Sequence, residues 1–359
     1  MTNCYLRKDG RWEARIALGT DANGKRRYRS VYGKTQEEAA YKRILAMQSQ
    51  EDEGIITEMT VRELCAEWLH HAQLRLKEST AANYRMKLDK HILPAFGDVL
   101  CHLLKRNQIY DFIERKLAEG LSARYVSDIV VLLKSIFRYG SREYQLRNTV
   151  DSVVLPKARR NEPALLSPAQ QSVLRSHIAA NLNRTTLGVA LSLNTGIRIG
   201  ELCALQWRDI DLSKRILYVR NTIQRIQCAD GEHRTKLIVT APKSRSSVRA
   251  IPIPEQLCKM LHRFAGAPDA FVLSGTAKPI EPRTMQYRFA KLLREIGLPS
   301  VRFHSLRHAF ASGCIALGFD VKTLSEILGH SSIELTLNQY VHSSMERKRA
   351  CMALLDQAA

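Results

Sequence analysis

The sequence predicts a multidomain α+β protein. We expect a small N-terminal domain with a three-stranded β-sheet and one helix, then an all-α domain, then a mainly α domain with a small antiparallel β-sheet. A chain of 359 residues exceeds the roughly 250 to 300 residues at which a single core stops growing. Strand-like alternation is confined to the first residues and to part of the second half, and helical periodicity fills the rest. The predicted domains are 1–57, 58–161 and 162–359.

The first domain is expected to begin with a hairpin. Residues Tyr5–Ile16 alternate on both sides of Asp9-Gly10, a dipeptide that favours tight hairpin turns. A second turn at 21–24 precedes a third strand, Lys25–Tyr32. Gln36–Leu45 is expected to be a helix, because Thr35 and Glu38 have the spacing of a capping box. A polar stretch, 48–58, then separates this domain from the next.

The second domain is predicted to be helical throughout. Thr60 can cap a helix over Val61–Leu69, and apolar residues recur at helical spacing in Ser79–Leu88 and Ser122–Phe137. The helix-breaking residues Pro94, Gly97 and Gly120 are expected to separate the helices. Val154–Pro163 is rich in proline and charge, as is typical of an extended linker.

The third domain is predicted to combine helices with three short strands. Ser167 is a good N-cap with Pro168 at the first helical position, and Leu187–Leu193 and Glu201–Trp207 suggest further helices. The strands are expected at residues 216–219, 237–240 and 248–253, with 242–249 as the turn of a hairpin between the last two. Ser305–Leu317 lacks helix breakers, and Gly329 is expected to end a later helix before a capping box starts the next at Ser331.

Composition narrows the function. A net charge of +20 and a pI near 9.8 favour a polyanionic partner, of which nucleic acid is the usual one. No apolar run is long enough to cross a membrane, and the N-terminus lacks a signal-peptide core. The eight cysteines form no C-x-x-C pair, so we expect buried thiols in a reducing compartment and no metal site. No motif for a cofactor is present, and a protein retained inside the cell is expected.

The second half of the chain contains an ordered set of chemically active side chains. They lie in Asn194–Glu201, in His304–His308, at the end of Leu328–His330 and at Tyr340, and include Lys243 between them. Moving a phosphodiester to a side-chain hydroxyl requires cationic donors that stabilise the extra charge on phosphorus. Arginine suits this because its planar fork bonds two oxygens and stays charged. The full set comprises Arg198, Lys243, His304, Arg307, His330 and Tyr340.

The expected local structure brings members of this set together. A helix places His304, Arg307 and His308 on one face because they are three and four residues apart. His330 is expected at a corner between two helices, pointing away from both, and Tyr340 at the end of the second helix.

These motifs resemble the tyrosine recombinases, in particular the integrases of phages and mobile elements. The resemblance implies that Tyr340 is the nucleophile and forms a 3′-phosphotyrosyl bond. It implies that Arg198, His304, Arg307 and His330 surround the phosphate, and that Lys243, in a β-hairpin, protonates the departing 5′ oxygen. Glu201 and His308 would support these groups. The family chemistry uses no cofactor or divalent metal.

The resemblance also assigns the domains and partners. Residues 1–57 would be an arm-type DNA-binding domain, 58–161 a helical core-binding domain with its linker, and 162–359 the catalytic domain. The expected partner is double-stranded DNA at attachment sites, bound by a homotetramer in the bacterial cytoplasm, with an excisionase or a host DNA-bending protein as further partners. The terminal segment 345–355 would dock on a neighbouring protomer or on its own domain. Candidate DNA contacts are Lys25, Arg26, Arg27, Arg29, Lys77, Arg85, Lys87, Lys90, Arg124, Lys134 and Arg245, each of which also fits a solvated surface residue.

Two other functions share some of these features. A type IB topoisomerase would use the same chemistry but needs no second duplex, and the arm-like N-terminal domain favours recombination. A non-catalytic architectural DNA-binding protein would not need all six positions of the set.

Overall fold

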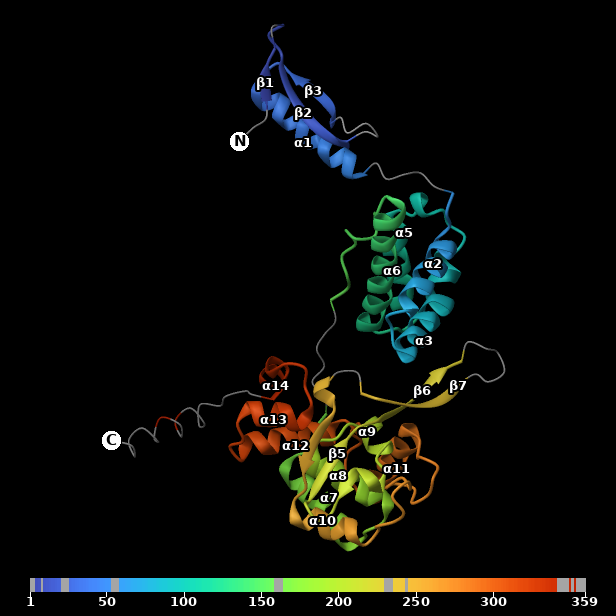
Figure 1. Cartoon of the computed structure of the whole chain (residues 1–359), viewed down its shortest axis with the longest axis vertical. Helices are drawn as coiled ribbons and strands as arrows, with labels where there is room; N and C mark the ends of the chain where they lie inside the picture. Colours follow the sequence, from blue (N-terminus) through green and yellow to red (C-terminus); the bar gives the residue numbers. More distant parts are fainter. Residues whose placement is uncertain are drawn as a thin grey trace. The chain divides into compact units, whose positions relative to one another are not determined.

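The computed structural model divides the chain into two compact units, Met1–Arg160 and Asn161–Ala359 (Figure 1). The residues that the structure describes are 4–7, 9–20, 26–52, 58–157, 164–228, 235–242, 245–340, 349 and 352. The predicted turn at 21–24, the whole segment 158–163 and nearly all of the C-terminal segment lie outside them.

A three-stranded antiparallel sheet begins the first unit, as predicted. Its strands are β1 (Cys4–Leu6), β2 (Trp12–Thr20) and β3 (Arg26–Gly33), in that order, with Cys4 opposite Ala14. Helix α1 (Gln36–Asp52) packs against β2 and β3, and Ala14, Ile16 and Ala39 are buried. The Thr35 hydroxyl caps α1 by accepting a hydrogen bond from the Glu38 amide at 3.1 Å. The helix runs into the polar stretch that was expected to end it.

The second part of this unit is helical and has its own core. Its α-helices are α2 (Val61–Gln73), α3 (Glu78–Lys87), α4 (Leu93–Phe96), α5 (Arg106–Ala118) and α6 (Ala123–Tyr144). Thr60 and Glu63 form a capping box at the start of α2, and the Ser122 hydroxyl caps α6. Leu64, Phe112 and Phe137 are among the fully buried side chains of this core. Helix α5 was not among the predicted helices.

Pro94 does not separate two helices, contrary to the prediction. The backbone passes from α3 through a π-helical turn, Leu88–Ile92, directly into α4, in which Pro94 lies in the first turn. Proline is tolerated there because the first turn of a helix needs no amide donor, and the π turn shifts the hydrogen-bond register just before it. Gly97 ends the helix, as expected.

The second unit surrounds a larger core centred on α8. Its buried side chains include Leu187 and Leu191 of α8, Leu217 of a central strand and Phe289. Ser167 and Gln170 form a capping box at Pro168, which begins the first helix, as predicted. The α-helices are α7 (Pro168–Ala180), α8 (Arg184–Thr195), α9 (Ile199–Cys203), α10 (Glu255–His262), α11 (Pro282–Glu295), α12 (Ser305–Ala316), α13 (Val321–Leu328) and α14 (Ile333–Tyr340).

Two small sheets accompany these helices. One has the order β4 (Ile210–Asp211), β5 (Ile216–Val219), β8 (Arg249–Pro252), and the other pairs β6 (Thr222–Gln227) with β7 (Thr235–Thr240). The predicted hairpin between β7 and β8 is therefore wrong, because these strands belong to different sheets. Strand β8 pairs instead with β5, and this places Ile251 in the main core.

The predicted helix over Glu201–Trp207 is shorter than expected. Helix α9 ends at Cys203, and Trp207 starts a 3-10 turn. The backbone after α9 is hydrogen-bonded to a neighbouring loop instead. The Trp207 amide donates to the Ala270 carbonyl at 3.1 Å, and the Val272 amide donates to the Leu205 carbonyl at 2.9 Å.

Candidate active site

Arg198 stands between two helices and is held by Glu201. Helix α8 ends at Gly196, whose φ of 63° lies in the left-handed region that glycine adopts without strain. Arg198 then occupies the N-cap of α9, where its amide donates to Glu201 Oε2 at 3.1 Å and its Nη1 to Oε1 at 2.9 Å. The Arg198 side chain is 36% exposed.

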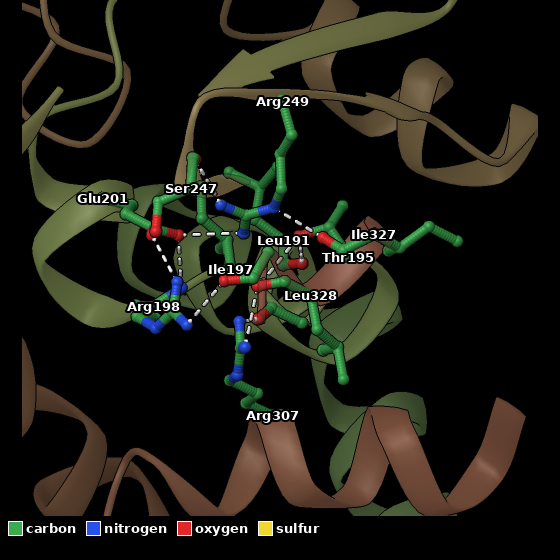
Figure 2. Close-up of polar contacts among 12 residues, drawn as sticks. Leu191, Thr195, Ile197, Arg198, Glu201, Ser247, Arg249, Arg307, Ile327 and Leu328 are labelled. Carbon is green, nitrogen blue, oxygen red and sulfur yellow. Dashed lines mark hydrogen bonds and ion pairs between the residues drawn. The ribbon is translucent and has the colours of Figure 1, made fainter. Parts of the chain in front are cut away.

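Glu201 joins two arginines. Its side chain is 3% exposed, and its Oε2 accepts a hydrogen bond from Arg249 Nη2 at 2.9 Å (Figure 2). Burial raises the pKa of this carboxyl, but the charges and hydrogen bonds of Arg249 and Arg198 outweigh burial and hold the pKa below its usual value. Glu201 is therefore a buried, ionised carboxylate between two guanidinium groups.

Arg307 approaches the same place from α12. It is 2% exposed, and it donates from Nη1 to the Gly196 carbonyl at 2.7 Å and from Nη2 to the Leu328 carbonyl at 2.8 Å (Figure 2). Arg307 thus links the end of α8 to the end of α13, which is 21 residues away from it in sequence. The structure brings Arg198 and Arg307 together around one backbone turn.

This turn carries His330. Helix α13 ends at Gly329, with φ of 67°, as predicted. The Gly329 carbonyl accepts a hydrogen bond from Arg198 Nη2 at 3.1 Å. His330 is half-buried, and its Nδ1 lies 2.7 Å from the Thr336 hydroxyl of α14. The expectation that His330 points away from both helices is therefore wrong, because its ring contacts the second one.

Cations and burial act on the histidines of the site. Burial, together with the charges of Arg307, Arg198 and Arg249 acting in the same direction, lowers the pKa of His330 to about 4. Partial burial of the imidazole, with His308, Arg307 and Arg198 nearby, also lowers the pKa of His304 to about 4, although His304 as a whole is an exposed residue. Both rings are neutral at pH 7 in this state.

His304 and His308 lie edge to face. Their ring centroids are 4.9 Å apart and their planes make an angle of 89°. His304 is the N-cap residue of α12, and His308 is buried one turn later, next to Arg307. The three residues do lie at the start of one helix, as expected, and the rings of His304 and His308 are in contact.

Two members of the predicted set are described incompletely. Lys243 lies outside the described residues, between β7 and a 3-10 turn at Arg245–Ser247. Tyr340 is the last residue of α14, and its backbone is described but its side chain is not. The roles of both remain predictions.

The candidate DNA contacts of the helical part have varied surroundings. Lys77, Lys90 and Arg124 are exposed, and Arg124 forms an ion pair of 3.6 Å with Asp128. Arg85 is half-buried, whereas Lys87 is 6% exposed with its ammonium 5.6 Å from the centroid of the Tyr125 ring. Lys134 donates to the carbonyls of Asp151 and Val153. Of the remaining candidates, Arg26, Arg27, Arg29 and Arg245 are described only in their backbone, and Lys25 lies outside the described residues.

Arg249 and Thr336 were not predicted as parts of the site. Arg249 is 48 residues away from its partner Glu201 in the sequence. Thr336 contacts His330 from the next helix, after the chain has turned a corner. Only the spacing of six between His330 and Thr336 offered a local signal.

Within the described part of the chain, no group of three or more metal-binding side chains occurs. Among the same residues, no helix is long and apolar enough to span a membrane. Five of the cysteines that are described are buried free thiols, which agrees with their predicted packing role.

Comparisons with known proteins match both units. The phage integrase family model matches residues 161–347, and the model of the phage integrase N-terminal SAM-like domain matches residues 60–117. A XerC-like tyrosine recombinase of Caldanaerobacter subterraneus subsp. tengcongensis is 27% identical over 95% of this chain and 94% of its own length. The ICEBs1 integrase of Bacillus subtilis is 25% identical over 80% of each chain.

Solved structures share the fold. The Tn1549 transposon integrase in complex with transposon right end DNA has a TM-score of 0.70 at 23% identity, covering 83% of this chain and 100% of that chain. A lambda integrase dimer bound to a COC' core site has a TM-score of 0.58 at 18% identity, covering 95% of each.

The fold and the relatives together define a tyrosine-type site-specific recombinase of the mobile-element integrase kind. Because the family model spans residues 161–347, more than half of the 359 residues, the chain belongs to the phage integrase family.

Proposed function

We propose that this recombinase cleaves and rejoins DNA through a 3′-phosphotyrosyl intermediate, and so integrates and excises a phage or other mobile element. The observation that carries this proposal is the meeting of Arg198 and Arg307 at the end of α13, beside His330, with Tyr340 ending the next helix. Transfer of a phosphodiester to a side-chain hydroxyl requires cationic donors around the phosphate and a nucleophile such as a phenol.

In the proposed reaction the Tyr340 phenolic oxygen attacks the scissile phosphorus. A bond forms between that oxygen and phosphorus, the bond from phosphorus to the 5′ oxygen breaks, and the phenolic proton passes to a neighbouring base. The 5′ oxygen leaves as a hydroxyl after receiving a proton, for which Lys243 is the proposed donor. Attack by the 5′ hydroxyl of another strand reverses these steps, so rejoining needs no external energy source.

The arginines would stabilise the five-coordinate phosphorus in two ways. Arg198 is the proposed direct donor, because a third of its side chain is accessible. Arg307 lies beneath the same turn, where its charge is poorly screened and its hydrogen bonds fix the Gly196 and Leu328 carbonyls. His304 and His330, neutral at pH 7, can accept a proton or donate a hydrogen bond to a phosphate oxygen.

DNA is the proposed partner of all three predicted domains. The net charge of +20 supports this, and the related Tn1549 and lambda integrases were solved with DNA. A lambda integrase tetramer was solved on a Holliday junction, which supports a homotetramer here. An excisionase, a host DNA-bending protein and a cytoplasmic location remain part of the proposal, as does the division at 57 and 161 into arm-type, core-binding and catalytic domains.

The test is capture of the covalent intermediate. The protein would be incubated with nicked duplexes that tile the DNA flanking its gene, where an integrase commonly has its own attachment site, and resolved under denaturing conditions. The wild-type chain should give a protein–DNA adduct and Tyr340→Phe none. Tyr287→Phe, which alters an exposed tyrosine on α11, is the matched control and should give the wild-type yield. An adduct that persists in Tyr340→Phe would refute the assigned nucleophile.

A further inference from the structure

Three consecutive carbonyls at the end of α13 each accept a hydrogen bond from a different arginine. Arg249 Nε donates to Ile327 at 2.5 Å, Arg307 Nη2 to Leu328 at 2.8 Å and Arg198 Nη2 to Gly329 at 3.1 Å. The last carbonyls of a helix lack partners within the helix and carry its negative dipole end, so guanidinium groups are suitable donors. The three arginines come from β8, α12 and the N-cap of α9.

Arg249 differs from the other two in what surrounds it. Its side chain is 6% exposed, and all three of its nitrogens donate within the protein: Nε to Ile327, Nη1 to the Ser247 carbonyl at 3.0 Å and Nη2 to Glu201. Figure 2 shows this guanidinium between Glu201 on one side and the end of α13 on the other. Such a buried and internally bonded group is poorly placed to hold DNA phosphate.

Two of the three partners of Arg249, Glu201 and Ile327, each connect to one residue of the proposed active site. Glu201 fixes Arg198 through hydrogen bonds to its backbone amide and its Nη1. The Ile327 carbonyl belongs to the last turn of α13, which leads through Gly329 to His330. Arg249 is therefore the shared connection between the segment that carries Arg198 and the segment that carries His330.

The side chain of Arg249 also packs closely against Gly329. A Cβ added at Gly329 would lie 3.0 Å from Arg249 Cδ, so the stem of this arginine packs against the turn before His330. Since the guanidinium is planar, its bonds to Glu201 and to Ile327 fix both partners in one plane at set directions. A lysine carries its donors on one nitrogen and so lacks the two separate nitrogens that reach Glu201 and Ile327 here.

We propose that Arg249 is a positioning residue for recombination, which sets the distance between Arg198 and His330 without contacting DNA. The inference rests on the proposed function, since it concerns the rate of phosphodiester cleavage at the same site. A catalytic group displaced by about 1 Å can cost on the order of a hundredfold in rate. Loss of Arg249 should therefore slow the chemical step and leave DNA affinity nearly unchanged.

The test compares Arg249→Lys with the wild-type chain on a nicked duplex carrying the site recovered from the adduct experiment. Single-turnover cleavage would be measured at saturating protein, and Kd separately by anisotropy on the same duplex. We expect the rate to fall by on the order of a hundredfold, with little change in Kd or in its salt dependence. Arg220→Lys is the matched control, because Arg220 also pairs with a buried carboxylate, Asp209, at 3.4 Å and has no contact to α13 in the described hydrogen bonds.

Several results would overturn the inference. A wild-type rate in Arg249→Lys would do so, as would a loss confined to Kd with a smaller salt slope, which marks a direct phosphate contact. Melting curves would set the assay temperature well below the transition of the variant, so that a loss of rate reports on folded protein. A second variant, Arg249→Ala, should recover part of its cleavage rate when guanidinium ion is added at millimolar concentration, and no recovery would count against the role. If the wild-type chain itself forms no adduct, the proposed function fails and this inference fails with it.

Discussion

The helical part of the first unit and the candidate active site of the second unit contain ion pairs in different surroundings. In the helical part of the first unit, the pairs Arg62–Asp98, Arg124–Asp128 and Arg138–Asp151 lie on the surface, and Arg138 is 65% exposed in its side chain. In the second unit the Arg249–Glu201 pair is 6% and 3% exposed. Surface pairs remain solvated and can exchange partners at little cost. The two charges of a buried pair must compensate each other, and the pair therefore fixes the geometry of the groups around it.

The largest expected effect tests the buried side of this contrast. Glu201→Gln keeps the shape of the side chain but leaves Arg249 with an uncompensated buried charge. We expect the free energy of unfolding of the second unit to fall by about 3 to 5 kcal/mol, as is usual when one partner of a buried pair is removed. Urea denaturation would measure it.

The matched control for this variant is Glu281→Gln, which removes a carboxylate paired with Arg225 at a more exposed place on the same unit. It should cost less than about 1 kcal/mol. Equal losses in the two variants would show that burial does not distinguish these pairs.

Stability should depend on pH in the acid range because of the two histidines of the site. The pKa values of His304 and His330 are lowered to about 4, whereas a histidine in an unfolded chain has a pKa of about 6.5. Between these values the unfolded chain binds protons that the folded chain does not, so stability is complete above pH 6.5 and falls as the pH decreases towards 4.

Denaturation curves across this pH window would measure the slope of stability against pH. The double variant His304→Gln, His330→Gln should have a shallower slope than the wild-type chain, while His262→Gln, at an exposed position on α10, should not. An unchanged slope in the double variant would mean that burial and the nearby arginines do not hold these rings neutral.

The smallest effect is expected on the surface. Arg138→Ala breaks two hydrogen bonds to the Asp151 carboxylate, at 2.8 and 3.0 Å, but both groups can be solvated instead. The free energy of unfolding should change by less than about 1 kcal/mol, and less still at high salt. A loss as large as that of Glu201→Gln would contradict the contrast between surface pairs and the buried pair.

Local signals in the sequence were sufficient where a few adjacent residues determine the structure. The Asp9-Gly10 hairpin, the caps at Thr60 and Ser167 and the helix end at Gly329 all depend on backbone conformation and hydrogen bonds within a few residues. The motifs that contain Arg198, His304, Arg307 and His330 could be recognised for the same reason, because each is a short string of adjacent residues.

Distant contacts explain what the sequence could not predict. Strand β8 pairs with β5 and not with β7 because Ile251 enters the main core and Arg249 reaches Glu201, neither of which is visible in the local pattern. Strand β6, Thr222–Gln227, alternates weakly and was missed. The link from Arg198 to the Gly329 carbonyl spans 131 residues and follows only from the tertiary fold.

The arginine contacts at α13 also constrain how its coding segment can evolve. Asp320 fixes the first turn through the Thr323 amide at 2.8 Å, and the arginines fix the last. Inserting or deleting one codon between them would rotate the last turn by about 100° and shift it by about 1.5 Å. All three carbonyls would then face away from their donors together, so this stretch should accept substitutions on its exposed side far more readily than any change of length.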